Sequence, residues 1–134
     1  MTHSLLMHRG LRHVALKIKN FDQCVHFYNK LLKLKIVWQP DPDNVYLSSG
    51  DDNLALHRTT NEFAKSEHQQ LDHLGFFLTN KEDVDQWHDY LRNENVVIKA
   101  PPKDHRDHTR SFYCADPDGN VIQFIYYPRN DLTS

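Results

Sequence analysis

The sequence predicts an α+β fold built from two βαβββ units. Two stretches, Leu11–Lys17 and Leu71–Phe77, each place a histidine two residues after a leucine, at the start of an apolar, strand-like run. Each run is followed by an amphipathic helical pattern and then by further strand-like pieces. Similarity at this spacing indicates that one supersecondary unit occurs twice in the chain.

The first unit begins with a strand at about 11–18. Alternation puts Val14 and Leu16 on one face of this strand and His13 on the other. The run 21–34 has apolar residues spaced for one face of a helix. Three more strands are expected, separated by turn-forming segments, at 36–38, 45–48 and 54–57. These elements give a first module over about 11–58.

The second unit repeats this order over about 71–128. A strand at about 71–78 precedes a helix at about 81–93, whose apolar stripe is Val84, Trp87 and Leu91. Three strands are expected to follow, at 96–99, 112–115 and 120–127. The segment 101–110 is predicted to be a loop, Asp116–Gly119 a tight turn, and the polar segment 59–70 the linker between the modules.

Composition places the chain among small cytoplasmic proteins. Its 134 residues fit one domain, predicted over 1–134. The net charge of −2 is made of interspersed acids and bases, so no nucleic-acid partner is expected. Cys24 and Cys114 are too few for a disulfide framework and are expected to be reduced thiols. No apolar run approaches the ~20 residues of a membrane span, so no membrane partner is expected either.

Two histidines at equivalent points of a repeat are candidate metal ligands. Alternation puts His13, His73 and Gln123 on strand faces opposite the helices, and His57 on the corresponding face of its own strand. Imidazole is the commonest protein ligand for a transition metal. A lone strand histidine is more often hydrogen-bonded within the fold, but two equivalent ones favour a shared ion between the repeats.

Several motifs resemble those of the vicinal oxygen chelate superfamily, which groups glyoxalase I, extradiol dioxygenases, fosfomycin-resistance thiol transferases and bleomycin-binding proteins. The resemblance covers about Leu11 to Tyr127. It rests on Leu-Arg-His-Val-Ala-Leu at 11–16, Phe-Tyr-Asn-Lys-Leu-Leu at 27–32, Leu-Asp-His-Leu-Gly-Phe at 71–76 and the run Ser111–Phe124. It implies that the modules form an eight-stranded, open, cup-shaped mixed sheet with the helices on its outer face, and that the protein is a homodimer.

The resemblance also implies one divalent metal ion inside the cup. Carried over residue by residue, its ligands are His13, His73 and Gln123, with a fourth place on the 54–57 strand. His57 could fill that place, whereas Ala55, the other occupant of this face, could not ligate. Two imidazoles with oxygen donors suit Zn²⁺, Ni²⁺, Fe²⁺ or Mn²⁺, and the ligand set does not choose among them.

Gln123 departs from the family pattern, in which this position is usually glutamate and is expected to be catalytic. An amide oxygen can ligate, but it carries no charge and takes no proton near neutral pH. Isomerases of the glyoxalase type would lose their base, and dioxygenases would lose the carboxylate of their iron triad. Gln123 is therefore either a ligand or a residue that orients substrate.

Three residues are candidates for binding substrate: Arg110, Phe77 and Tyr113. The guanidinium of Arg110 could hold a substrate carboxylate or phosphate with two parallel hydrogen bonds. For the charged segment before it, a solvated loop is the simpler interpretation. Phe77 and Tyr113 could line the cup, and ordinary core packing is the alternative interpretation of each.

Two functions remain in competition. The first is a metal-dependent enzyme of the glyoxalase or dioxygenase type, a lyase, isomerase or dioxygenase whose small-molecule substrate chelates the metal through neighbouring oxygens. The second is a non-catalytic binding protein of the bleomycin-resistance type. The histidine pair favours the first function and Gln123 favours the second.

Overall fold

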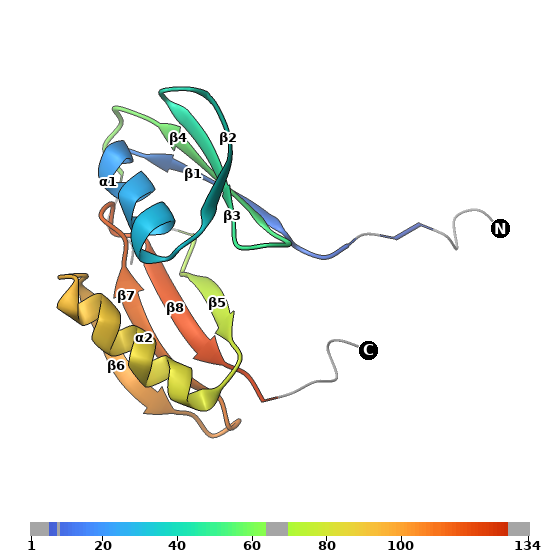
Figure 1. Ribbon diagram of the computed structural model, residues 1–134, viewed down its shortest axis with the longest axis vertical. Helices are drawn as coiled ribbons and strands as arrows, with labels where there is room; N and C mark the ends of the chain where they lie inside the picture. The colour runs from blue at the N-terminus through green and yellow to red at the C-terminus, as the bar shows by residue number, and fades with distance from the viewer. Residues whose placement is uncertain (1–5, 8, 64–69, 129–134) are drawn as a thin grey trace. The chain divides into compact units, whose positions relative to one another are not determined.

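The computed structural model describes residues 6–7, 9–63 and 70–128. The chain divides into two compact units, Met1–Thr60 and Asn61–Ser134. Each unit carries its own four-stranded mixed sheet with helical structure against it (Figure 1). The predicted α+β class with two βαβββ modules is confirmed. The predicted linker 59–70 falls largely on residues 64–69, which lie outside the described ranges, and a single domain over 1–134 stays a prediction.

The first unit has the strand order β1-β4-β3-β2. β1 runs parallel to β4, whereas β3 is antiparallel to both β4 and β2. Register pairs Val14 with Leu54 and Leu16 with Leu56, the two apolar rows assigned to the helix side. The elements are β1 (His13–Ile18), α1 (Phe21–His26), η2 (Phe27–Leu31), β2 (Lys35–Asp41), β3 (Asn44–Ser48) and β4 (Asn53–Arg58).

The helix predicted over 21–34 is shorter and changes type midway. α1 ends at His26, and the chain continues as the π-helical segment η2. The backbone N–H of Leu32 donates to the carbonyl of Phe27 at 2.9 Å, a bond that spans five residues. The wider turn lets the adjacent Phe27 and Tyr28 both reach the core, where their rings meet edge to face with centroids 5.0 Å apart.

The second unit repeats the topology with the strand order β5-β8-β7-β6. β5 runs parallel to β8, and the remaining pairs are antiparallel. The helix predicted over 81–93 is confirmed at both ends, and its start is fixed by the Asn80 N–H, which donates to the Asp83 carboxylate at 3.1 Å. The elements are β5 (Leu74–Leu78), α2 (Lys81–Asn93), β6 (Ile98–Asp104), β7 (Arg110–Ala115) and β8 (Val121–Tyr126).

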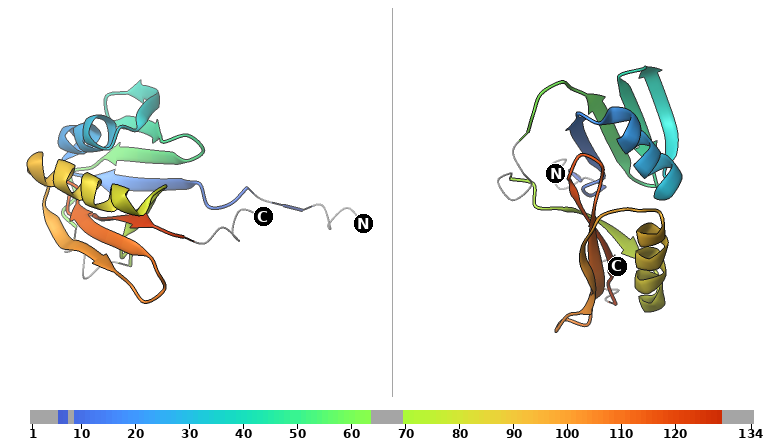
Figure 2. Two further views of the ribbon diagram at one scale, coloured as in Figure 1. Left: turned by 60° about the horizontal axis from the view of Figure 1, so that its bottom comes forward. Right: turned by 90° about the vertical axis from the view of Figure 1, so that its left-hand side faces the viewer.

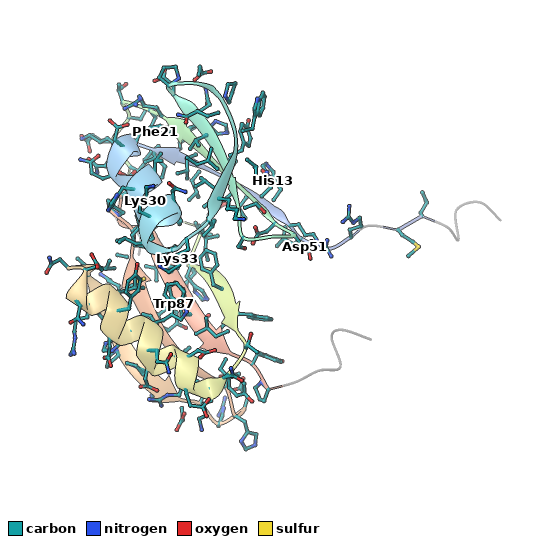
Figure 3. All side chains as sticks on the ribbon, viewed as in Figure 1. His13, Phe21, Lys30, Lys33, Asp51 and Trp87 are labelled. Atoms are coloured by element: carbon teal, nitrogen blue, oxygen red, sulfur yellow. The ribbon has the colours of Figure 1, made fainter. Side chains whose placement is uncertain are left out.

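α2 covers one face of the second sheet, as both views of Figure 2 show. Trp87, labelled in Figure 3, stacks on Phe124 with ring centroids 5.2 Å apart. Phe124 in turn stacks on Phe112 at 5.2 Å. Alternation therefore leaves Tyr113 and Gln123, the neighbours of these core residues along β7 and β8, on the opposite face of the sheet.

The prediction of a loop over 101–110 was wrong for its first part. β6 runs through Pro101 and Pro102 to Asp104, and it pairs with β7 with two register shifts. Proline lacks a backbone N–H, and β6 lies at the edge of its sheet, where such a donor is not required on the outer side. Within the described ranges, no helix is long and apolar enough to cross a membrane.

Candidate functional site

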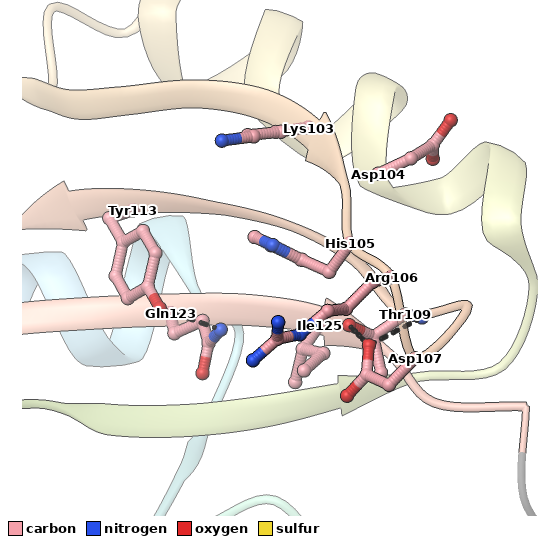
Figure 4. A pocket seen from close by; sticks show the side chains of 9 residues that line it. All are labelled: Lys103, Asp104, His105, Arg106, Asp107, Thr109, Tyr113, Gln123 and Ile125. Atoms are coloured by element: carbon pink, nitrogen blue, oxygen red, sulfur yellow. Dashed lines mark hydrogen bonds between the residues drawn. The ribbon is translucent and has the colours of Figure 1, made fainter.

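A hollow of about 530 Å³ opens on the face of the second sheet opposite α2 (Figure 4). Its floor is formed by side chains of β7 and β8, and its wall by the end of β6 and the turn that follows. The volume is within the range that small-molecule sites occupy. The lining residues are Lys103, Asp104, His105, Arg106, Asp107, Thr109, Tyr113, Gln123 and Ile125.

Gln123 is held in one orientation on this floor. Its Nε2 donates to the Tyr113 hydroxyl at 3.0 Å, and Tyr113 is its register partner on β7. On the other side Gln123 pairs with Gly75 of β5, and a Cβ added to Gly75 would lie 3.7 Å from Gln123 Oε1. Because the amide nitrogen is engaged by Tyr113, its oxygen is the atom left to accept a ligand beside the bare glycine backbone.

His73 lies next to these residues, immediately before β5. Its ring meets that of Tyr113 edge to face with centroids 5.3 Å apart. His73 Nδ1 is 2.6 Å from a carboxylate oxygen of Asp72. Since that oxygen accepts, Nδ1 carries the proton and Nε2 keeps its lone pair, which is the arrangement seen in metal-binding histidines backed by a carboxylate. The second unit thus brings together His73, Tyr113 and Gln123.

His13 has a comparable environment in the first unit, at the start of β1 (Figure 3). Its Nδ1 is 2.8 Å from the side-chain oxygen of Asn53, its register partner on β4. An amide oxygen also accepts, so Nε2 of His13 again keeps the lone pair. Both strand histidines therefore present the same ring nitrogen for ligation.

His57 is not brought next to His13. It pairs with Lys17, whereas His13 pairs with Asn53, so the two histidines are four residues apart along adjacent strands, or about 13 Å. His57 Nδ1 is 2.6 Å from the side-chain oxygen of Asn44 instead. The residue that corresponds to Gln123 is Ala55, because Ala55 pairs with the residue two beyond His13, as Gln123 pairs with the residue two beyond His73.

Arg110 is engaged away from the hollow. It shares a sheet face with Phe112, which lies beneath α2, and its guanidinium binds Asp85 of that helix at 2.8 and 3.0 Å. A third hydrogen bond reaches Asp104 at 3.1 Å. These hydrogen bonds raise the pKa of Arg110 and lower those of Asp85 and Asp104. The guanidinium thus holds helix to sheet, and it is not among the groups lining the hollow.

Phe77 shares the open face of the second sheet but is not among the lining residues. It pairs with Ile125, which does line the hollow, and its ring stacks on Tyr127 with centroids 5.7 Å apart. It is 69% exposed, which is high for a phenylalanine. Its position makes it a neighbour of the hollow rather than part of its wall.

Sequence reasoning missed the two cations that line the hollow, Lys103 and Arg106. Both sit on or just after the edge strand β6, in the segment predicted to be a solvated loop. It also passed over His105, whose Nε2 lies 3.0 Å from the hydroxyl of the buried Ser111. Alternation along β7 could have shown which residues face the hollow, because it puts Ser111 and Tyr113 on one face of the strand and Arg110 and Phe112 on the other.

The two lining carboxylates are fixed by neighbours. Arg110, by its hydrogen bond, lowers the pKa of Asp104, with a smaller contribution from Lys81. Thr109 donates to Asp107 from its backbone N–H at 3.1 Å and from its hydroxyl at 2.7 Å, and these bonds lower the pKa of Asp107. Both groups are therefore ionised at neutral pH and bind protons weakly.

The candidate donors for a metal ion are neutral and come from both units. Within 6–7, 9–63 and 70–128, no three His, Cys, Asp or Glu side chains gather closely enough to hold one. The donors with the fitting chemistry are Nε2 of His13, Nε2 of His73 and Oε1 of Gln123, two imidazoles and an amide oxygen. Such a set fits a borderline divalent metal without adding a ligand charge.

The repeated βαβββ topology, with a histidine leading the first strand of each unit, defines a protein built from a duplicated module with a polar hollow on the open face of its second sheet. The family model described as the Glyoxalase/Bleomycin resistance protein/Dioxygenase superfamily matches residues 10–124. The chain belongs to this superfamily. The vicinal oxygen chelate resemblance expected from the sequence is thereby confirmed.

Within the superfamily, the chain is similar in sequence to metallothiol transferases. The chain is 27% identical over 118 residues to the metallothiol transferase FosB of Staphylococcus saprophyticus, a match covering 87% of this chain and 76% of that protein. It is 25% identical over 118 residues to the metallothiol transferase FosB of Staphylococcus haemolyticus, covering 87% and 83%.

Solved structures share the fold. The fosfomycin resistance protein FosX of Listeria monocytogenes superposes with a TM-score of 0.74 at 16% identity, covering 90% of this chain and 95% of that one. The lactoylglutathione lyase of Agrobacterium tumefaciens superposes with a TM-score of 0.73 at 19% identity, covering 89% and 94%. At these identities the likeness shows the fold alone.

Proposed function

We propose that this protein is a metal-dependent enzyme that transfers a thiol to a small, anionic, electrophilic substrate. The observation that carries the proposal is the make-up of the hollow, in which the cations Lys103 and Arg106 line the same space as the hydrogen-bonded Gln123 and Tyr113. These cations suit a phosphonate, phosphate or carboxylate group. Of the two carboxylates that also line the hollow, Asp104 is already paired with Arg110. The similarity to metallothiol transferases supports thiol transfer in particular.

The proposed metal ligands are His13, His73 and Gln123. The Nδ1 hydrogen bonds of the two histidines orient their Nε2 atoms, and the Tyr113 hydroxyl orients the Gln123 oxygen. A divalent ion bound there supplies Lewis acidity to neighbouring substrate oxygens. The identity of the ion, Zn²⁺, Ni²⁺, Fe²⁺ or Mn²⁺, is left to experiment, and His57 is expected to take no part in this set because of its register.

Gln123 argues against the reactions expected of other superfamily members. In the family pattern, isomerisation of the glyoxalase type and the related lyase chemistry take their base from the position of Gln123, and an amide does not supply one there. Oxygen activation by iron needs two histidines and a carboxylate, and the carboxylate is missing here. Thiol addition to an epoxide requires neither feature, since the nucleophile's proton can go to another group.

The test combines metal analysis with product detection. Untagged protein is expected to bind one equivalent of Mn²⁺ or Zn²⁺ by isothermal titration and to join L-cysteine to fosfomycin, an epoxide phosphonate, as detected by mass spectrometry. His73→Ala should abolish both, while His26→Ala, which changes an exposed helix residue, should leave both unchanged. Methylglyoxal hemithioacetal and catechols complete the panel, and turnover of either one in place of fosfomycin would overturn the thiol-transfer proposal.

A binding protein of the bleomycin-resistance type is the second candidate. The absence of a three-residue His, Cys, Asp or Glu cluster in the described part of the chain favours it, as does the amide at position 123. This function predicts bleomycin binding without metal, an unchanged melting temperature in chelator and no product from any substrate in the panel.

Assembly and location complete the proposal. We expect a homodimer, as the family resemblance implies, with a mass near twice 15.9 kDa in light scattering. A cytoplasmic location is supported by Cys24 and Cys114, which are both buried and form no disulfide.

A further inference from the structure

We propose that His105 is the proton-transfer residue of the hollow, taking the proton that the amide at position 123 is unable to take. This inference rests on the proposed function, because it assigns the base for that thiol addition. It is based on the residues that line the hollow, on the hydrogen bonds that each of them already makes, and on the direction of the His105 ring.

The hollow contains one imidazole. His105 follows β6 directly, and its ring extends into the space beside Tyr113 and Gln123 (Figure 4). Its backbone N–H donates to the carbonyl of Thr109 at 2.9 Å, which closes the turn and fixes the position of the residue. Gln123 therefore faces the hollow from β8, and His105 faces it from the turn that follows β6.

The other ionisable groups around His105 are poorly suited to accept a proton. Lys103 and Arg106 are cations, and cationic side chains have no free lone pair. Asp104 is bound by Arg110 at 3.1 Å, and Asp107 accepts two hydrogen bonds from Thr109. Tyr113 already accepts from Gln123 at 3.0 Å. An imidazole, by contrast, exchanges protons readily near neutral pH.

Ser111 defines which nitrogen of His105 would act. The hydroxyl of Ser111 is 3.0 Å from Nε2 of His105 and is itself buried, at 2% exposure for the residue. The proposal assigns the ring proton to Nε2, which then donates to this hydroxyl, so that the lone pair lies on Nδ1. Ser111 is thus a positioning residue for the base.

The step balances without a redox partner. The thiol S–H gives its proton to His105 Nδ1, the sulfur electron pair forms a C–S bond to an epoxide carbon, and the C–O bond breaks. The alkoxide then takes a proton from the imidazolium, which regenerates the neutral ring. Thiol and epoxide give a β-hydroxy thioether, and Lys103 and Arg106 hold the anionic group of the substrate throughout.

The main test is His105→Gln, because glutamine keeps a donor for Ser111 and removes the base. With Mn²⁺, fosfomycin and L-cysteine, kcat/KM at pH 7 should fall by at least about 100-fold while KM for fosfomycin changes little. The residual rate should rise about tenfold per pH unit, following the free thiolate, whereas the wild-type rate should level off. Added imidazole should restore part of the rate.

His108→Asn is the matched control. His108 lies in the same turn, is exposed, is not among the residues lining the hollow and has a φ of 70°, a conformation that asparagine tolerates. This variant should keep wild-type kinetics. Activity of His105→Gln within threefold of wild type would overturn the assignment while leaving the proposed function standing.

A second readout needs no turnover. In metal-free protein, the ring proton resonances of His105 should shift on titration with fosfomycin, and those of His108 should not. Unchanged His105 resonances at saturating fosfomycin would place the substrate elsewhere and overturn the assignment. A wild-type protein that forms no product with Mn²⁺, fosfomycin and L-cysteine would instead refute the proposed function, and the role of His105 with it.

Discussion

Arg110 of β7 binds both carboxylate oxygens of Asp85 in α2, with Nη2–Oδ1 and Nε–Oδ2 distances of 2.8 and 3.0 Å. The bond joins the helix to the sheet on the face opposite the hollow. Planar two-pronged pairing of this kind is specific to arginine, since a lysine ammonium acts as a point charge. The relationship gives Arg110 a structural role.

Replacing Arg110 should weaken the second unit. Arg110→Ala removes three hydrogen bonds and leaves Asp85 and Asp104 without their shared cation, so we expect the free energy of unfolding to fall by about 1–2 kcal/mol. Arg110→Lys should recover less than half of that loss. Urea unfolding followed by Trp fluorescence measures the change, and Lys99→Ala, an exposed change in β6, serves as the control.

The same pair should make stability fall in acid. Arg110 lowers the pKa of Asp85 below its ordinary value, so the stabilisation is present above about pH 4 and is lost as the pH falls through the folded-state pKa. Asp85→Asn should flatten the melting temperature between pH 4 and pH 2 relative to wild type. Parallel curves for the two proteins would contradict this origin of acid sensitivity.

The cysteines should resist modification until the protein unfolds. Burial, with a smaller contribution from Asp116, raises the pKa of Cys114 to about 12. At pH 8 this corresponds to a thiolate fraction of about one in ten thousand, and the thiolate is the reactive form. A disulfide exchange reagent should label neither Cys24 nor Cys114 in the native state within minutes and both in guanidinium. Fast native labelling would contradict the burial of these thiols.

Gly75 tests how tightly Gln123 is held. The added Cβ of Gly75→Ala would meet Gln123 Oε1 at 3.7 Å, an ordinary van der Waals distance. We expect normal folding, with a change in melting temperature of no more than about 2 °C. Gly75→Leu should instead cover the amide oxygen and weaken Mn²⁺ binding by at least about tenfold. Equal Mn²⁺ affinity in the two variants would show that this oxygen is not a ligand.

Gln123→Glu should strengthen metal binding by restoring a ligand charge. The carboxylate keeps the length of the side chain and reverses its bond with Tyr113, whose hydroxyl then donates. We expect the Mn²⁺ dissociation constant to fall by about tenfold or more, measured by isothermal titration. An unchanged constant would place the metal away from position 123, and Gln86→Glu on the exposed surface of α2 provides the control.

The sequence predicted most of the fold because the spacing of apolar residues indicates each helix or strand, and the repeated pattern indicates their order. The apolar stripe of Val84, Trp87 and Leu91 predicted the α2 helix at about 81–93, which is its observed range, and the structure adds Asn80 as the cap at its start. η2 was missed because an i to i+5 pattern buries nearly the same apolar residues as an α-helix does. The extension of β6 through Pro101 and Pro102 was missed because proline usually ends a strand unless the strand lies at an edge.

The sequence predicted the residues on the floor of the hollow but not those of its wall, at the end of β6 and in the turn that follows. Tyr113 and Gln123 lie on strands, and His73 lies directly before one, so alternation assigns their face. Arg110 was a candidate for its guanidinium chemistry, whereas alternation along β7 places it on the face of Phe112. Lys103 comes after register shifts in β6 that cannot be read from the sequence, so the sheet face on which it lies is known only from its pairing with Ser111 of β7. His105 and Arg106 follow this strand directly.

The prolines of the edge strands bear on how this protein limits strand-to-strand aggregation. β2 carries Pro40, β6 carries Pro101 and Pro102, and these strands form one border of each sheet. Proline lacks a backbone N–H, so another strand that paired with this edge would miss hydrogen bonds. This disfavours edge-to-edge aggregation. The opposite borders, β1 and β5, contain no proline. In each sheet, an added strand would therefore find an edge without proline only at β1 or β5, next to His13 or His73.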